Sequence, residues 1–282
     1  EKYGFNKTTT TTFFIDFIKN IVLSAILGGV LLSIMVFLYT KRGEYFWIYS
    51  WIFVSAFSLF LATFYTSLIV PIFNKLKPLE EGTLRESIKE YTNKVGFSLK
   101  NIYVIDGSKR SSKSNAYFSG LGSNKAIVLY DTLIEDNTDK ELTAILAHEV
   151  GHYKKKHILF TMVLSILQMG IMFYIFGSLS RNENVALALG AKENSFHIVS
   201  IAFSMLYTPI LLITGILMNL LSRKNEFEAD AFAKETYGAE PLISSLKKLS
   251  KKHLSNLTPN KFYTFIHYSH PPLVERLKAL IK

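Results

Sequence analysis

Long apolar stretches alternate with polar segments along this chain. Four of the apolar stretches are long enough to cross the hydrocarbon core of a bilayer, which takes about 20 residues of helix. They are residues 21–39, 45–71, 158–179 and 196–221. Buried helices of a water-soluble bundle should keep a polar face, and these stretches show almost none. The pattern therefore predicts a multi-pass transmembrane protein, which agrees with a mean hydropathy of +0.22.

The basic residues are distributed unevenly around these stretches. If four helices cross the membrane, the segments 1–20, 72–157 and 222–282 share one side, and they carry 28 of the 32 Lys and Arg. Several of these residues lie directly at span ends, among them Lys19, Lys75, Lys77, Lys154, Lys155, Lys156, Arg223 and Lys224. The positive-inside rule then predicts that this side faces the cytoplasm, either of a bacterial cell membrane or of a eukaryotic endoplasmic reticulum membrane.

The same pattern divides the chain into four parts. We expect N-terminal transmembrane helices in 1–71, a cytoplasmic region in 72–157, further transmembrane helices in 158–221 and a C-terminal region in 222–282. Because the basic residues follow the span ends and form no single stripe with aromatic residues, we expect no nucleic-acid binding. The chain has no cysteine, which excludes disulfides, thiolate metal ligands and cysteine catalysis.

The polar parts show mixed secondary-structure signals. An amphipathic helix is predicted over 78–95, and strands over 101–108 and 125–134, with residues 115–120 as a third, edge strand. A further helix is predicted to begin after Thr138, which forms a capping box with Glu141. No residue clearly stops this helix, so we expect it to run unbroken into the third span. The fold class is therefore mainly α, with a small α+β part.

The helix after Thr138 carries a candidate metal site in "HEVGH". His148 and His152 are four residues apart, so both imidazoles leave one face of the helix and can bind one ion. Glu149 lies beside them without being a ligand. This arrangement is that of zinc peptidases, in which the two histidines bind zinc and the glutamate is the general base.

A catalytic zinc takes a third protein ligand, and "SRKNEFEADAFAK" just past the fourth span offers one. Glu226 and Asp230 share a helix face, whereas Glu228 is turned about 200° away from Glu226. We therefore expect Glu226 to be the third ligand. Asp230 is expected to accept a hydrogen bond from His148 or His152 and so to orient that ring.

Three motifs in this order, "HEVGH", "SRKNEFEADAFA" and "HYSHPPLVERLKAL", resemble the type I CAAX prenyl protease family, which are integral-membrane zinc endopeptidases. The segments "EKYGFNKTT" and "SNAYFSGLGSNKAIVLYDTLI" resemble the family as well, so the resemblance extends over essentially the whole chain. The family has seven spans where we count four, and we expect its N-terminal helices to be missing ahead of Glu1.

The resemblance implies a small zincin-like catalytic domain with one zinc ion, and a site at the membrane surface where a prenylated peptide is anchored in lipid. Glu149 would take a proton from water and pass it to the leaving amine. His270 is the candidate donor to the oxyanion; Arg276 could share that role or brace the substrate. In the edge strand, Asn115 would bond an extended substrate, and Ala116 and Tyr117 would line the cleft.

Other interpretations remain open at this point. A membrane quality-control zinc protease of the heat-shock type would use the same metal motifs on unmodified substrates. A non-catalytic membrane scaffold could retain the fold, although the complete set of His148, Glu149, His152 and Glu226 argues against it. We expect His157, His197 and His253 to be interfacial or exposed, and leave His267 undecided. The oligomeric state does not follow from the sequence.

Overall fold

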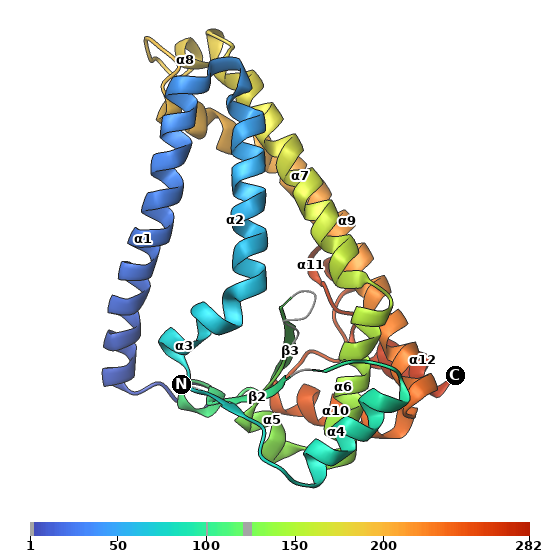
Figure 1. Ribbon diagram of the computed structural model, residues 1–282. Coiled ribbons are helices and arrows are strands. Elements are labelled where there is room, and N and C mark those ends of the chain that lie inside the picture. The colour runs from blue at the N-terminus through green and yellow to red at the C-terminus, as the bar shows by residue number, and fades with distance from the viewer. Residues whose placement is uncertain (1–2, 100, 121–125) are drawn as a thin grey trace. The chain divides into compact units, whose positions relative to one another are not determined.

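The computed structural model describes residues 3–99, 101–120 and 126–282, which form two compact units. Within these residues, unit 1 combines the N-terminal segment up to Phe14 with 62–158 and 216–282, and unit 2 combines 15–61 with 159–215. Each unit is therefore built from segments far apart in the sequence. Figure 1 shows long helices in unit 2, and shorter helices with a small sheet in unit 1.

Three helical stretches among the described residues are long and apolar enough to cross a membrane: Thr10–Phe73, His157–Ser180 and Phe196–Thr236. The first contains two of the four predicted spans as separate helices. The elements in order are α1 (Thr10–Arg42), η1 (Gly43–Tyr45), α2 (Phe46–Leu68), α3 (Val70–Phe73), α7 (His157–Ser180), α8 (Asn184–Ala188) and α9 (Phe196–Thr236). α1, α7 and α9 are longer than their apolar stretches, because helical structure continues into the polar segments at their ends, whereas α2 ends at Leu68 within the stretch 45–71.

Unit 2 is held together by aromatic packing between its helices. Phe46 is 1% exposed, and its ring lies 5.3 Å from Tyr39 and 5.6 Å from Phe176. The Tyr39 hydroxyl donates to the backbone oxygen of Asn194, and Trp51 Nε1 donates to that of Ile166. Most other large apolar side chains of these helices are exposed, as expected for helices surrounded by lipid.

Unit 1 contains a four-stranded sheet in the order β1-β2-β4-β3. The strands are β1 (Leu76–Pro78), β2 (Asn101–Ile105), β3 (Ala116–Ser119) and β4 (Ala126–Tyr130). β2 and β4 pair in parallel, β1 pairs antiparallel with β2, and β3 pairs antiparallel with β4. β3 is therefore an edge strand, which confirms the prediction for 115–120.

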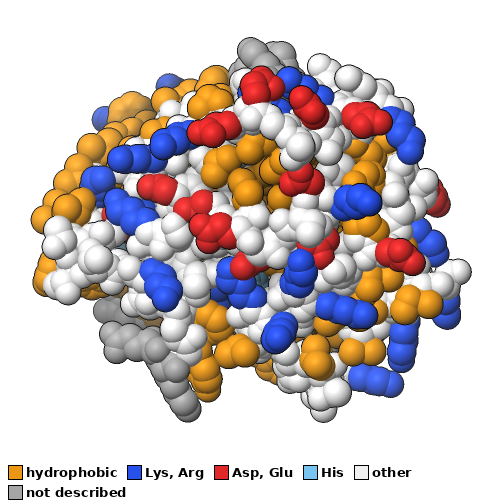
Figure 2. Space-filling model, turned by 90° about the horizontal axis from the view of Figure 1, so that it is seen from below, with side chains coloured by type: hydrophobic (Ala, Val, Ile, Leu, Met, Phe, Trp, Pro, Cys, Tyr) orange, Lys and Arg blue, Asp and Glu red, His pale blue; other side chains and the backbone are white. Residues whose placement is uncertain are grey.

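The helices of unit 1 pack with the sheet around a core of Leu, Ile, Val, Ala and aromatic side chains. Those that contribute to this core are α4 (Thr83–Lys94), α5 (Asp131–Asp136), α6 (Asp139–Lys154), α10 (Ala239–Lys252) and α12 (Leu273–Ile281). The short η2 (Gly107–Lys109) and α11 (Lys261–His267) also belong to unit 1. On the face of the molecule seen in Figure 2, acidic and basic side chains are interspersed, which is typical of a surface in contact with water.

The structure corrects the predicted secondary structure in four places. The helix predicted over 78–95 begins at Thr83, since Leu76–Pro78 forms β1, and the strand predicted over 101–108 ends at Ile105. The helix after Thr138 does not run into the third span: α6 ends at Lys154, and α7 begins at His157. Lys156 has a φ of 60°, a left-handed conformation that cannot continue a helix. The strand predicted over 125–134 ends at Tyr130, because Asp131 begins α5, and Lys125 lies outside the described residues.

Candidate metal centre

α6 presents His148 and His152 on one face. The capping box at its start is confirmed: Thr138 Oγ1 accepts from the Glu141 backbone, and Glu141 Oε2 accepts from the Thr138 backbone. Gly151 lies between the two histidines, on the side where α6 meets α9. A Cβ at Gly151 would lie 3.0 Å from the Ala229 Cα, so a larger residue would require α9 to shift by a few tenths of an ångström. α6 and α9 are thereby held in direct backbone contact beside the histidines.

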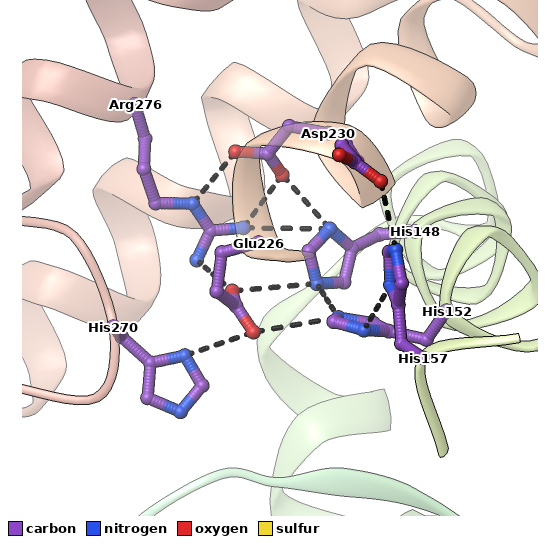
Figure 3. Close-up of polar contacts among 8 residues, drawn as sticks. His148, His152, His157, Glu226, Asp230, His270 and Arg276 are labelled. Atoms are coloured by element: carbon purple, nitrogen blue, oxygen red, sulfur yellow. Dashed lines mark hydrogen bonds and ion pairs between the residues drawn. The ribbon is translucent and has the colours of Figure 1, made fainter. Parts of the chain in front are cut away.

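α9 brings Glu226 to these histidines. Glu226 Oε1 lies 3.3 Å from His152 Nε2, and Glu226 Oε2 lies 3.6 Å from His148 Nε2. The two Nε2 atoms are 3.2 Å apart. One ligand atom from each of the three residues lies within 4.8 Å of the other two, and Figure 3 shows the three side chains converging.

The three side chains fit a metal ion chemically. Two imidazole nitrogens and one carboxylate oxygen form a donor set that suits zinc and related divalent ions. Glu226 is 4% exposed, and among the described residues its Oε2 atom is buried without a hydrogen bond. Two imidazoles whose Nε2 atoms face each other need a cation or a proton between them. The residues present therefore form a preorganised place for a metal.

Asp230 and Arg276 brace this group. Asp230 Oδ1 lies 2.8 Å from His148 Nδ1, so the carboxylate accepts from the ring nitrogen opposite the one that faces Glu226. Arg276 donates to both oxygens of Asp230, at 2.8 and 2.6 Å, and its Nη1 lies 3.3 Å from Glu226 Oε2. Burial alone would lower the pKa of Arg276, but the carboxylates of Asp230 and Glu226 outweigh it and raise the pKa. Arg276 is therefore positively charged.

A cavity of about 550 Å³ opens in unit 1 beside these residues. His148, Glu149, Glu226, His270 and Arg276 lie in its wall. Burial raises the pKa of Glu149; the charge of Glu226 raises it too, against the opposing effect of the two histidines and Arg276. A carboxyl group with a raised pKa is a better proton acceptor when it is ionised. Glu149 is therefore the group in this wall suited to proton transfer.

Comparison with known proteins identifies the family. The model of peptidase family M48 matches residues 78–282, and the model described as "CAAX prenyl protease N-terminal, five membrane helices" matches residues 1–75. The chain belongs to peptidase family M48. This result confirms the resemblance drawn from the motifs, and with the fold it makes the chain a multi-pass membrane protein of the M48 family.

Several M48 relatives are similar over almost the whole chain. CAAX prenyl protease 1 homolog from Oryza sativa subsp. japonica is 41% identical, and CAAX prenyl protease 1 from Saccharomyces cerevisiae is 39% identical; each match covers 99% of this chain and 66% or 65% of the relative. The crystal structure of Ste24p from S. mikatae is 40% identical with a TM-score of 0.92, over 99% of this chain and 68% of that one. The chain thus spans about two thirds of the length of these relatives.

The remaining site residues predicted for this M48 chain fall into two groups. Asn115 and Ala116 line the cavity, and Asn115 Oδ1 accepts from the Ala116 backbone. Tyr117 is placed elsewhere: it packs against Val128 in a separate cluster, because successive strand residues face opposite sides of a sheet. Tyr117 is not among the residues that line this cavity, and its contact with a substrate stays a prediction.

His270 and Arg276 both contact the metal-binding group of the M48 site. His270 Nδ1 lies 3.1 Å from Glu226 Oε1, and this contact raises the pKa of His270 in spite of its partial burial. Arg276 contacts Asp230 and Glu226 and also lines the cavity, so the substrate contact expected from the sequence stays a prediction. His267 lies against the Tyr263 ring, away from the residues that line the cavity.

Of the three histidines expected to be interfacial or exposed, His157 is buried, so the prediction for it is wrong. His157 is 7% exposed and contacts both His152 and Glu228. His253 lines the cavity, and its Nε2 atom accepts from the Ser114 backbone directly before the edge strand. His197 is exposed, as predicted. A sequence signal for His157 did exist, since it follows His152 by only five residues and precedes an apolar helix in which an unpaired imidazole would be costly.

Proposed function

We propose that this chain is an integral-membrane zinc endopeptidase that hydrolyses peptide bonds near the C-terminus of CAAX-type prenylated peptides, or of other membrane-associated peptides. The observation that carries the proposal is the convergence of His148, His152 and Glu226 next to a cavity whose wall includes His148, Glu149 and Glu226. The names of the similar M48 proteins support the substrate class. The catalytic region then comprises residues 72–157 and 222–282, with the membrane helices in 1–71 and 158–221.

One zinc ion would be the cofactor, and His148, His152 and Glu226 are the residues that would hold it. Bound there, zinc supplies Lewis acidity that polarises a carbonyl group and makes a water molecule easier to deprotonate. Asp230 fixes the His148 ring, because its carboxylate accepts from Nδ1 at 2.8 Å. Arg276 keeps Asp230 ionised and in place.

The chain's own side chains perform the proton and charge steps. Glu149 accepts the proton of the attacking water and later delivers it to the leaving amine. His270, in the wall of the same cavity, donates a hydrogen bond to the developing oxyanion. The Arg276 guanidinium adds positive charge to this wall while it keeps its hydrogen bonds to Asp230.

The substrate binds as an added strand. β3 is an edge strand, so its unpaired backbone groups are available to an extended peptide. Asn115 and Ala116 line the cavity at the start of β3, which places this end of the strand beside the metal group. A peptide paired there would present a backbone carbonyl to Glu149 and His270.

The membrane setting fits a lipid-bound substrate. Basic residues gather at the ends of the apolar helices on the side of the polar segments, so we assign this side to the cytoplasm, and the eukaryotic relatives favour the endoplasmic reticulum membrane. A prenyl chain partitions into lipid, which concentrates its peptide at this surface.

The test is a cleavage assay on the purified protein with a CAAX peptide in prenylated and unprenylated form. We expect faster cleavage of the prenylated peptide, and Glu149→Gln should lower the rate by about 10²- to 10⁴-fold at unchanged zinc content. Equal rates on both peptides would favour the quality-control alternative. Absence of both cleavage and bound zinc would favour the scaffold, and activity that survives Glu149→Gln would refute the general base.

A further inference from the structure

Behind His152, on the side away from Glu226, lies a pair of residues that the proposed chemistry does not use. His157 Nδ1 is 3.1 Å from His152 Nδ1, and His157 Nε2 is 3.0 Å from Glu228 Oε2. The His157 side chain is 8% exposed and that of Glu228 is 40% exposed. The contacts therefore run from a carboxylate near solvent, through a buried imidazole, to one of the three candidate metal ligands (Figure 3).

The other histidine ligand has a simpler arrangement. His148 Nδ1 meets the carboxylate of Asp230 directly, at 2.8 Å. Metal-binding histidines commonly donate their second ring N–H to a carboxylate, which fixes the tautomer and raises the basicity of the ligand. We propose that His157 and Glu228 together do for His152 what Asp230 does for His148: they form a two-residue relay that positions His152 and strengthens its bond to a divalent metal.

The hydrogen positions of this relay follow from the network. If His152 binds the metal through Nε2, its neutral ring carries the proton on Nδ1. His157 Nδ1 must then accept that proton's hydrogen bond, which leaves the His157 proton on Nε2. His157 Nε2 donates in turn to Glu228, whose ionised carboxylate only accepts. Each hydrogen bond in the series sets the direction of the next one, and all of them favour the tautomer of His152 that binds metal.

The backbone prepares His157 for this role. α6 ends at Lys154, and the left-handed conformation of Lys156 interrupts the helix before α7 starts at His157. The His157 side chain can thereby meet His152 from the preceding helix, which an uninterrupted helix would not allow at a spacing of five residues. Glu228 reaches the relay from α9, two residues after Glu226. The helix break is thus the feature that makes the relay possible.

Zinc affinity tests the relay, which rests on the metal site of the proposed function. The dissociation constant is measured on the purified full chain by competition with a chelator. We expect His157→Phe to weaken zinc binding by about 10- to 100-fold. His157→Asn should stay close to wild type, because its Oδ1 can accept from His152 Nδ1 where the imidazole nitrogen did. His197→Phe, at an exposed histidine, is the matched control and should change nothing.

A double-mutant cycle separates a relay from two independent structural effects. Glu228→Ala should weaken zinc binding about tenfold in the wild-type background. In the His157→Phe and His157→Asn backgrounds it should have no further effect, because Glu228 acts on His152 only through the imidazole. Glu235→Ala, an exposed carboxylate on the same helix, is the control.

The possible outcomes are distinguishable. Wild-type zinc affinity in His157→Phe, or equal losses from Glu228→Ala in all backgrounds, would overturn the relay while leaving the metal site intact. A wild-type protein that binds no zinc would overturn the metal site and the relay together. Thermal unfolding of the metal-free variants checks that each one folds. If His157→Phe does not fold, the effect of Glu228→Ala on zinc affinity is compared between the wild-type and His157→Asn backgrounds, and that comparison tests the relay.

Discussion

The two units of this protein follow opposite rules for burial. Every buried Asp, Glu and His among the described residues belongs to unit 1: Glu141, His148, His157, Glu226 and Asp230. In the described part of unit 2, the buried polar side chains are serines, Ser50 and Ser55. Exposed Leu, Ile and Phe side chains cover the long helices of unit 2 instead.

This difference shows what each surrounding medium contributes. In unit 1, water provides the hydrophobic driving force, and the core it creates is strong enough to hold a charged network at its edge. Lipid provides no such force in unit 2, so its helices associate through close packing and a few hydrogen bonds, such as that from Gln168 to Thr214. Substitutions should therefore destabilise the two units for different physical reasons.

The largest effect is expected where unit 1 buries opposite charges. Arg276→Met removes the guanidinium that contacts both Asp230 and Glu226 and leaves these buried carboxylates with histidine partners alone, so the metal-free protein should lose about 3–5 kcal/mol of unfolding free energy. Thermal unfolding in detergent measures this loss, and added zinc should restore part of it. Arg85→Met, at a surface pair with Glu81, should cost no more than about 1 kcal/mol. Equal losses at both arginines would contradict the role given to burial.

A charge placed on unit 2 should be costly for another reason. Leu206 is 59% exposed in the middle of the fourth apolar stretch, and Lys at this position should cost about 2.5–3.5 kcal/mol of insertion free energy. Leu257 is 52% exposed in unit 1, and Lys there should change stability by less than about 0.5 kcal/mol. A membrane-insertion assay compares the two variants. If Leu206→Lys leaves the insertion free energy unchanged, this side chain does not face lipid.

Acid should weaken unit 1 through Glu141. Burial would raise the pKa of this carboxyl, but hydrogen bonds from Lys248, Ser244 and Thr138 outweigh it and lower the pKa to about 2. Because the folded pKa lies below the unfolded value of about 4.5, the stabilisation is complete above pH 4.5 and is lost as the pH falls towards 2. The contribution of Glu141 to the unfolding free energy above pH 4.5 amounts to about 3 kcal/mol. Unfolding free energies of wild type and Glu141→Gln should therefore converge as the pH falls, and parallel profiles would contradict this assignment.

The smallest effects are expected at close helix contacts, one in each unit. Gly151→Ala forces a Cβ against Ala229, and Gly177→Ala forces one to within 2.9 Å of Trp47 Cβ. Each should cost about 1–3 kcal/mol. Only Gly151→Ala should also weaken zinc binding, since it separates the helices that carry the ligands. Gly28→Ala, with open space around it, should be neutral or stabilising by up to about 1 kcal/mol. Zinc titration together with thermal unfolding distinguishes the variants.

The sequence predicted those features that depend on local patterns. The apolar stretches, the capping box at Thr138 and the edge strand all follow from residue spacing within one element. The approach of Glu226 to His148 and His152 was predictable as well, because two short motifs with complementary chemistry lie on the same side of the predicted membrane spans.

The features that escaped prediction depend on contacts between distant residues. Glu228 meets His157 from 71 positions away, and Arg276 meets Asp230 from 46 positions away. The break at Lys156 has no local glycine or proline to announce it, and it makes sense only once His157 is seen to contact His152. Tyr117 is different: the alternation of strand residues already implied that it could not share a face with Ala116.

Glu226 shares α9 with the fourth apolar stretch, with no interruption between Phe196 and Thr236. In an α-helix each residue turns the chain by about 100°, so adding or deleting a single residue between this stretch and Glu226 would rotate the carboxylate to another side of the rod. The direction in which the Glu226 side chain leaves α9 therefore depends on the number of residues that precede it in this helix.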